Sequence, residues 1–462
     1  MQLYKRKSGE EQPFWPLGPF KVRLPLVHYR WETAEMVQGL VLFVISLSMI
    51  PILENQLGLP YDVALAYVLV CQVCFMLPAM LGVPFIPGWI TPALPLVLVF
   101  LGNFEPGPEA IQAMFALQFL VFLIFFILGV TGLGSALVRI IPASLKAGMI
   151  IGAGIAALFG EFEEGGRVAE TPIAITVGFF ISLFLIFGVA FQDWIKTSRL
   201  AKIIASYGIV PGMLAAIGLA WIIGEYDLPS VEWGITQPAF TEMWAYLPFS
   251  VGFPSLDVFM LAVPMALVAY VIAFGDIIVA RSLVARVDDM RPDEKIDYSI
   301  DRAHHVTGLR NFIHCFFAPY PGLAGPVFTA GTATIAERYK QGPEAMESIF
   351  SGGGTFMVTW FIAIFMLPLI TTFEPVLPIA LSLTLLLTGY ICLMVGMEEV
   401  SSTVERGVAG TMGVILALYG AGWGLAAGVV LYYLVEKKNL FGWEVRHHEH
   451  QDSGERSPEG RD

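Results

Sequence analysis

The sequence predicts an all-α polytopic membrane protein with fourteen transmembrane segments. Of its 462 residues, 56% are hydrophobic and only 14% are charged, whereas a soluble globular chain carries about 25% charged residues. Apolar runs long enough for a spanning helix recur along the chain. A soluble fold of this size could not bury so much apolar surface. The composition also excludes a disordered chain, a secreted disulfide scaffold and a nucleic-acid binder.

Polar or Pro- and Gly-rich connections separate the apolar segments. A spanning helix needs about 20 residues, and a broken one is shorter. The third, ninth, tenth and thirteenth segments are short. The expected segments are residues 33–53, 61–81, 90–102, 110–131, 143–160, 170–191, 200–224, 255–281, 308–319, 326–338, 353–371, 376–395, 407–419 and 421–436.

The basic residues support this count. All but Arg167 of the 26 Lys and Arg residues fall in the termini or in alternate connections, with Arg302 and Arg310 assigned to the connection before the ninth segment. Because basic loops stay on the cytoplasmic side, we expect both termini in the cytoplasm and the protein in the inner (plasma) membrane. The expected domains are a cytoplasmic N-terminal segment (1–32), a first repeat of segments 1–7 (33–224), an extracytoplasmic loop (225–254), a second repeat of segments 8–14 (255–436) and a disordered cytoplasmic tail (437–462).

The two halves of seven segments each would insert in opposite orientations, which is the inverted-repeat plan of many transporters. The third segment of each half begins with the same sequence motif. Segment 3 begins with Pro87-Gly-Trp-Ile-Thr-Pro92, and segment 10 with Pro321-Gly-Leu-Ala-Gly-Pro326. Both read P-G-x-x-x-P, at equivalent places in the two halves.

This motif predicts half-helices that begin within the membrane. Pro87 and Pro321 disfavour a helix before them, Pro92 and Pro326 suit a first helical turn, and Thr91 is a suitable N-cap. Two half-helix N-termini would direct free N–H groups and positive dipole ends toward one place, which suits a polar or anionic solute. The alternative is a pair of ordinary Pro-kinked helices.

Several polar residues lie in apolar segments, where ionisable groups are costly and mostly functional. Asp276, in the eighth segment, could carry a proton or bind Na⁺; alternatively it pairs with Arg281 or a basic loop residue. Gln38 could contact solute or another helix. Thr329, Thr332 and Asn311 could contact solute or backbone carbonyls.

Other features carry no chemistry. Cys71 and Cys74 form a CxxC inside a spanning segment and are interpreted as small buried residues. The histidines of residues 447–450 lie in the polar tail. Neither a nucleotide-binding loop nor a catalytic motif is present. No cofactor is expected, so uphill transport would need H⁺ or Na⁺.

Three stretches resemble the nucleobase–ascorbate transporter (xanthine/uracil permease) family. They are the run from Met36 to Pro51, the run Leu81–Pro92, and Gly308–Gly322, which also resembles the sulfate permease family. The resemblance implies fourteen spans in two intertwined inverted repeats, with a core domain of segments 1–4 and 8–11 and a gate domain of segments 5–7 and 12–14. It also implies solute binding between segments 3 and 10, and a homodimer.

The chain departs from both families. Ile272 stands where nucleobase transporters carry a Glu, and Val327 and Phe328 stand where they carry an acid or amide. Asp276 follows Gly275 where uracil permeases have a coupling histidine. The tail is too short for the folded cytoplasmic domain of typical sulfate permeases.

These features predict a secondary transporter, a H⁺ or Na⁺ symporter of a small polar organic solute such as a nucleobase. The alternative is an anion transporter or exchanger of the sulfate permease type; a passive channel or an enzyme fits less well. The expected partners are the solute, the lipid bilayer and a second copy of the chain. The solute-binding candidates are Gln38, Trp89, Thr91, Pro92, Val327, Phe328 and Thr329. Asp276 is the ion-coupling candidate. The structural candidates are Asn311, Pro87, Pro321, Gly325 and Pro326.

Overall fold

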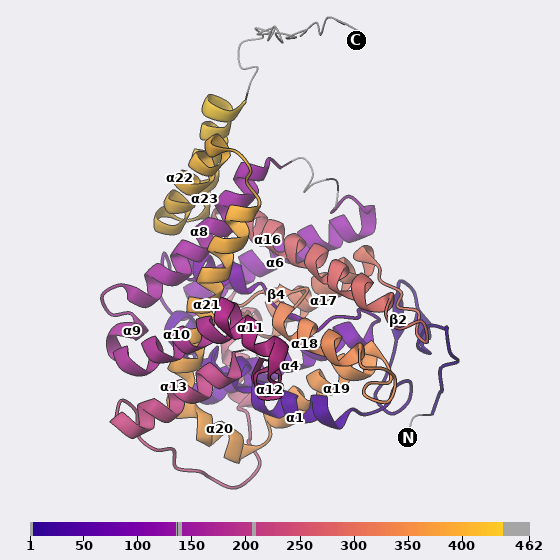
Figure 1. The fold of residues 1–462 in the computed structure, drawn as a ribbon. Helices are drawn as coiled ribbons and strands as arrows, with labels where there is room; N and C mark the ends of the chain where they lie inside the picture. Colours follow the sequence, from indigo (N-terminus) through magenta and orange to yellow (C-terminus); the bar gives the residue numbers. More distant parts are fainter. Residues whose placement is uncertain (1–2, 135, 137–140, 206–208, 438–462) are drawn as a thin grey trace, which may run out of the picture.

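The computed structural model describes residues 3–134, 136, 141–205 and 209–437, without the side chains of residues 41, 202, 203, 278, 279, 282, 283, 286, 329, 330, 333, 334 and 337. The described chain is mostly helical, which confirms the all-α prediction (Figure 1). Its strands form two short two-stranded sheets, β1–β2 and β3–β4. Most of the predicted tail (437–462) and the histidines of 447–450 lie outside the described residues.

In the first half, Pro occupies the first or second position of α6, α10 and α13, where a helical N–H would have no partner. The elements of this half are β1 (Trp15–Leu17), β2 (Phe20–Val22), α1 (Thr33–Leu42), α2 (Val44–Leu47), α3 (Ile50–Leu57), α4 (Tyr61–Met80), β3 (Gly88–Trp89), the 3-10 turn η1 (Thr91–Ala93), α5 (Leu94–Leu101), α6 (Pro108–Thr131), α8 (Ala143–Phe162), α9 (Arg167–Glu170), α10 (Pro172–Phe187), α11 (Val189–Thr197), α12 (Arg199–Ala205) and α13 (Val210–Ile223).

In the second half, side-chain caps start several helices: Ser348 and Ser402 form capping boxes at α19 and α22. The elements are α14 (Phe240–Met243), η2 (Trp244–Tyr246), α15 (Pro248–Val251), α16 (Leu256–Asp288), α17 (Ile300–Phe317), β4 (Ala324–Gly325), α18 (Thr329–Tyr339), α19 (Ile349–Ala363), α20 (Leu367–Phe373), η3 (Glu374–Val376), α21 (Leu377–Glu398), α22 (Thr403–Tyr419), α23 (Ala421–Leu431) and the π-helical turn η4 (Tyr432–Glu436).

Several helices are long and apolar enough to cross a membrane. Within the described residues there are 6, or up to 7 if α10 and α11, which are bent by 56° to each other, form one span. Shorter apolar helices include η1–α5, α13 and α19. The chain is therefore a helical membrane protein with several apolar spans. The fourteen segments expected from the sequence are more than length and composition identify in the described part of the chain.

Several predicted segments have different limits. The ninth was expected at 308–319, but α17 begins at Ile300, where the hydroxyl of Ser299 accepts a hydrogen bond from the Arg302 N–H at 3.2 Å. The assignment of Arg302 and Arg310 to a connection was therefore wrong: both lie within α17 and are buried. Their charge suggested a loop, whereas their guanidinium groups bond to backbone carbonyls inside the fold.

The boundary between segments 11 and 12 also moves. The expected segments 353–371 and 376–395 become α19, which ends at Ala363, and a helical run from Leu367 through α20 and α21. Pro368 starts this run early, since proline is favourable in a first helical turn.

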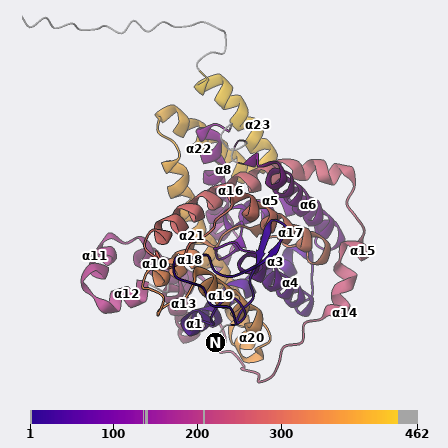
Figure 2. The same ribbon diagram turned by 90° about the vertical axis from the view of Figure 1, so that its right-hand side faces the viewer.

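The helices pack in two groups (Figures 1 and 2). In one group, α6 packs on α16 and α17, α19 packs on α1, α4 and α18, and α16 packs on α18. In the other, α8 packs on α21 and α22, α10 packs on α13 and α21, and α22 packs on α23. Between the groups, α5 and η1 contact α8, and η1 also contacts α21.

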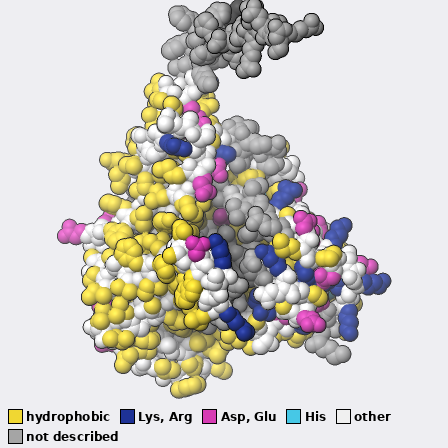
Figure 3. Space-filling model, viewed as in Figure 1, with side chains coloured by type: hydrophobic (Ala, Val, Ile, Leu, Met, Phe, Trp, Pro, Cys, Tyr) yellow, Lys and Arg dark blue, Asp and Glu magenta, His cyan; other side chains and the backbone are white. Residues whose placement is uncertain are grey.

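The N-terminal segment (residues 3–32) is folded against the first group. Arg6 pairs with Asp293 at 3.1 Å and Lys21 pairs with Asp297 at 2.6 Å, which ties the segment to the connection between α16 and α17. Figure 3 shows charged side chains gathered on this side of the molecule, while the face over α10 and α13 is largely apolar. Basic residues of this segment are therefore paired with acids of that connection.

Candidate functional site

The two P-G-x-x-x-P segments meet in the middle of the molecule. Strands β3 and β4 pair antiparallel, with Gly88 opposite Gly325 and Trp89 opposite Ala324. Both strands are fully buried. We refer to residues 86–91 and 322–328 as the crossing. Because the strands run in opposite directions, the helices that follow them leave the crossing in opposite directions, and both begin beside it.

Helices begin directly after each strand. On one side, η1 starts at Thr91 and continues into α5; on the other, α18 starts at Thr329 with Phe328 as its N-cap residue. The expectation that Thr91 caps the helix is wrong, because Ile90 is the cap residue and no side chain accepts from the first turn. Within this turn Pro92 has no N–H, and the Ala93 N–H donates to the Ile90 carbonyl at 2.8 Å.

The strands approach so closely that only glycine fits. A Cβ on Gly88 would lie 2.9 Å from the carbonyl oxygen of Val327, and one on Gly325 would lie 2.5 Å from the Trp89 carbonyl. A Cβ on Gly322 would lie 2.8 Å from the Trp89 ring. These contacts are shorter than carbon atoms tolerate, so the glycines permit the crossing.

Side-chain amides hold one strand in place. The Asn311 side chain accepts from the Ala324 N–H at 3.0 Å and donates to the Ala324 carbonyl at 2.9 Å. Gln118 of α6 donates to the Asn311 Oδ1 at 3.4 Å and accepts from the Tyr320 N–H at 2.9 Å. These buried amides satisfy backbone groups that regular secondary structure leaves unpaired.

A hydroxyl joins the two segments at the start of α18. The Thr332 hydroxyl accepts from the Ile86 N–H at 3.2 Å and donates to the Ile86 carbonyl at 3.4 Å. The Phe328 N–H donates to the same carbonyl at 2.6 Å. Thr332 thus bonds to backbone, which was one of the two expectations for this residue.

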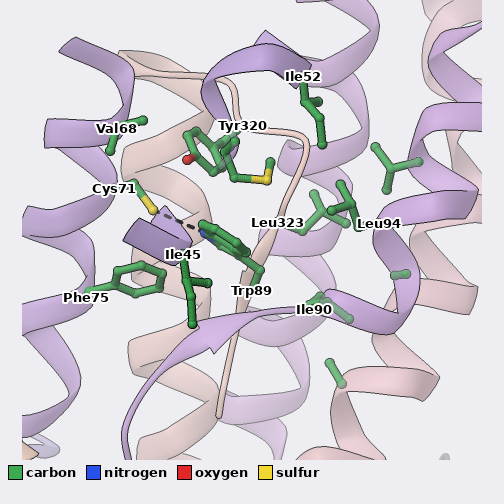
Figure 4. Packing of buried hydrophobic residues seen from close by; sticks show 14 of the residues in the cluster. Ile45, Ile52, Val68, Cys71, Phe75, Trp89, Ile90, Leu94, Tyr320 and Leu323 are labelled. Carbon is green, nitrogen blue, oxygen red and sulfur yellow. Dashed lines mark hydrogen bonds between the residues drawn. The ribbon is translucent and has the colours of Figure 1, made fainter. Parts of the chain in front are cut away.

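Trp89 lies in an apolar cluster (Figure 4). Its indole N–H donates to the Cys71 sulfur at 3.4 Å, and its ring lies 6.1 Å from the rings of Phe75 and Tyr320. The Trp89 side chain is only 6% exposed. Cys71 and Cys74 are buried free thiols, as expected for small apolar residues. Among the described residues, no group of three metal-ligand side chains gathers.

Asp276 lies in α16, partly buried, close enough to Cys392 of α21 to interact with it electrostatically. Helix α16 also contacts η1, which in turn contacts α21. In the described part of the chain, no ion pair joins Asp276 to Arg281 or to another basic side chain.

The other candidates lie at different depths. Thr91 and Pro92 are half-buried where η1 meets α8 and α21, and Val327 is buried at the crossing. Gln38 is half-buried on α1, and its Oε1 is buried without a hydrogen-bond partner among the described groups. The side chain of Thr329 lies outside the described part of the structure. Pro87, Gly325 and Pro326 are buried in the crossing, and Pro321 is buried directly before it.

Sequence reasoning missed Arg310. This side chain is 0% exposed and donates to the carbonyls of both Gly88 and Gly325. Its charge suggested a cytoplasmic loop. A signal was available, because Arg310 precedes Asn311 within an otherwise apolar run.

A separate cavity of about 290 Å³ lies away from the crossing, lined by Gly132, Gly134, Arg281, Tyr298, Ile300 and Asp301. None of the solute-binding candidates lines it. We therefore place the candidate site at the crossing, where two broken helices begin against the second helix group.

Paired broken helices inside a bundle of apolar spans define a membrane transporter. A family model described as "Permease family", for xanthine/uracil permeases, matches residues 63–324, which is more than half of the chain. The chain therefore belongs to the xanthine/uracil permease family and is a permease, as the resemblance implied. No curated protein sequence matches it.

Solved structures with a similar fold include anion transporters. The structure of SLC26A9 is 14% identical, with a TM-score of 0.52 over 87% of this chain; this chain covers only 65% of that one. The transmembrane domain of the cyanobacterial bicarbonate transporter BicA is 15% identical, with a TM-score of 0.49 over 86% of this chain and 96% of that one. Murine Slc26a9 in the inward-facing state is 13% identical, covering 87% and 68%, with a TM-score of 0.49.

Proposed function

We propose that the chain forms fourteen segments in two inverted repeats, with the domain limits expected from the sequence. Helix packing supports this, because contacts recur when each segment is exchanged with the one seven places away. The contact between α6 and α17, which are segments 4 and 9, corresponds to the contact between α19 and α4, which are segments 11 and 2. The contact between α6 and α16, which are segments 4 and 8, corresponds to the contact between α19 and α1, which are segments 11 and 1. Likewise α8–α22 (5 and 13) corresponds to α10–α21 (12 and 6).

The two packing groups support a core domain of segments 1–4 and 8–11 and a gate domain of segments 5–7 and 12–14. The crossing belongs to the core, and η1 and α5 meet the gate helices α8 and α21. Alternating access is then a rigid movement of core against gate, with the solute carried at the crossing. Cytoplasmic termini and a plasma-membrane location rest on the distribution of basic residues. A homodimer rests on the family resemblance.

The function we propose is ion-coupled symport of a small polar organic solute such as a nucleobase. The observation that carries it is the antiparallel pairing of Gly88 with Gly325, which brings the starts of two half-helices together. The positive dipole ends at these starts, together with N–H groups of the first turn of α18, would bind polar groups of a solute. The residues proposed to line the solute site are Gln38, Trp89, Thr91, Pro92, Val327, Phe328 and Thr329.

Asp276 is the proposed site of ion coupling. It lies on a helix of the proposed core, close enough to Cys392 of a proposed gate helix to interact with it electrostatically, so its occupancy by H⁺ or Na⁺ can bias the core–gate movement. The second candidate function is transport or exchange of an anion. It is favoured by the apolar side chains of Ile272 and Val327, both buried, which provide no carboxylate to repel an anion.

A thermal-shift screen of the purified protein tests the proposal. The panel contains uracil, xanthine, adenine, ascorbate, sulfate, bicarbonate and small carboxylates, each at several pH values with and without Na⁺. A ligand at a hundred times its Kd adds about 2.7 kcal/mol, which is readily detected. A shift with a nucleobase that grows at low pH or with Na⁺ supports symport. A shift with anions only, and no effect of Asp276→Asn on transport, supports the second candidate.

A further inference from the structure

We infer that Arg310 is a positioning residue for transport that also selects the charge of the solute. It holds the starts of both half-helices together and leaves one positive charge directly behind the crossing. This inference rests on the proposed binding of solute at the crossing, and it concerns a residue of α17 that lies outside the solute-lining set.

The first step is the geometry of the Arg310 guanidinium. One of its terminal nitrogens donates to the carbonyl of Gly325 and the other donates to the carbonyl of Gly88 at 2.9 Å. These two glycines are register partners in the strand pair. A single planar group therefore holds one carbonyl from each half of the chain, which a lysine ammonium cannot reproduce with the same fork geometry.

The second step is the charge of the group. Arg310 is fully buried, and among the described side chains no carboxylate pairs with it. Its surroundings are the Phe75 ring, 5.3 Å from its guanidinium carbon, and the thiols of Cys71 and Cys74. Its Nε is buried without a hydrogen-bond partner in the described structure. An arginine keeps its charge under all these conditions.

The third step joins charge and site. A buried charge without a counter-ion is costly, and carbonyl dipoles offset only part of that cost. The positive dipole ends of η1–α5 and α18 begin beside the same carbonyls, so they add to the positive potential instead of cancelling it. A solute with negative charge at the crossing supplies the missing counter-charge, whereas a neutral solute of the same shape does not.

The test compares two probes of similar shape and different charge, neutral uracil and anionic barbiturate, at neutral pH. Full-length protein and three variants are measured by thermal shift and by uptake into proteoliposomes. Arg310→Gln removes the charge and keeps a donor, Arg310→Lys keeps the charge and removes the fork, and Arg406→Gln is the matched control at an exposed arginine of α22.

We expect the wild type and the control to prefer barbiturate. Arg310→Gln should reduce that preference at least about tenfold, because it removes a buried charge partner. Arg310→Lys should keep the preference in binding while maximal uptake falls, since the strands lose their common clamp. A merely structural role would lower the stability of both Arg310 variants without changing the ratio of affinities for the two probes.

A wild type that prefers uracil overturns the inference without any variant, so a misfolded Arg310→Gln protein does not leave it undecided. An unchanged ratio in a folded Arg310→Gln protein overturns it as well. Failure of the proposed function looks different: the wild type would then bind neither probe and no other member of the screening panel.

Discussion

Gly88 of β3 lies directly opposite Gly325 of β4, although the two residues belong to different halves of the chain. Each approaches the backbone of the other segment so closely that a Cβ would overlap with it, at 2.9 Å from the Val327 oxygen and 2.5 Å from the Trp89 oxygen. The neighbours are backbone atoms held by several hydrogen bonds, so they cannot move aside easily. The crossing therefore depends on glycine at both positions.

Replacing one of these glycines should disable transport. We expect Gly325→Ala to reduce uptake at least about tenfold and to destabilise the protein by about 1–3 kcal/mol, which is typical of overpacking. The control is Gly410→Ala in α22, where a Cβ meets nothing within 4 Å. Uptake and melting temperature are measured for both. Normal uptake by Gly325→Ala would show that the strands do not pack this closely.

The amide of Asn311 should be essential for stability. Asn311→Leu keeps a similar volume but leaves the N–H and the carbonyl of Ala324 without their side-chain partner. Each unsatisfied buried group costs about 1–3 kcal/mol, so we expect a clear fall in melting temperature. Asn103→Leu, at an exposed amide that bonds only within its own turn, should change stability by no more than about 0.5 kcal/mol. Equal effects of the two variants would contradict the bracing role of Asn311.

Asp276→Asn should separate binding from coupling. The amide has the shape of the carboxylate but cannot take up a proton or neutralise Na⁺, so we expect concentrative uptake to be lost while solute exchange across the membrane continues. Concentrative uptake is measured in proteoliposomes with an imposed pH or Na⁺ gradient. Solute exchange is measured by counterflow without a gradient. Gradient-driven uptake equal to that of the wild type would exclude Asp276 as the coupling site.

Asp293, in the connection between α16 and α17, makes stability depend on acid pH. Its hydrogen bond from Arg291, followed by the bond from Arg6, lowers the pKa of its carboxyl to about 2 in the folded protein. Because the folded pKa lies below the unfolded value of about 3.9, the stabilisation is complete above the unfolded pKa and is lost as the pH falls through the folded one.

Because the carboxyl is partly exposed and screened by water, this contribution is at most about 2 kcal/mol. Unfolding free energies of the wild type and Asp293→Asn are therefore expected to converge between about pH 4 and pH 2. Asp257→Asn, at an acid in the first turn of α16 without a described ion pair, is the control. A difference between wild type and Asp293→Asn that stays constant with pH would contradict this account.

Much of the architecture could be predicted from local properties of the chain. The low charge and the apolar runs determine a helical membrane protein, because lipid leaves a spanning backbone few alternatives to a helix. Pro92 lies in the first turn of η1, as expected from its missing N–H. The matching expectation for Pro326 was wrong, because α18 begins only at Thr329. The match of these two motifs predicted that the two segments belong together, and the structure pairs them as β3 and β4.

Only the tertiary structure decided which side chains hold that site together. Arg310 was assigned to a loop because a charge is costly in an apolar segment, and only the carbonyls of Gly88 and Gly325, distant in sequence, make its burial tolerable. Arg302, near the start of α17, likewise donates to the Gly82 carbonyl of a distant segment. Sequence determines local backbone preference, whereas the partners of a buried polar group exist only once the two halves have folded against each other.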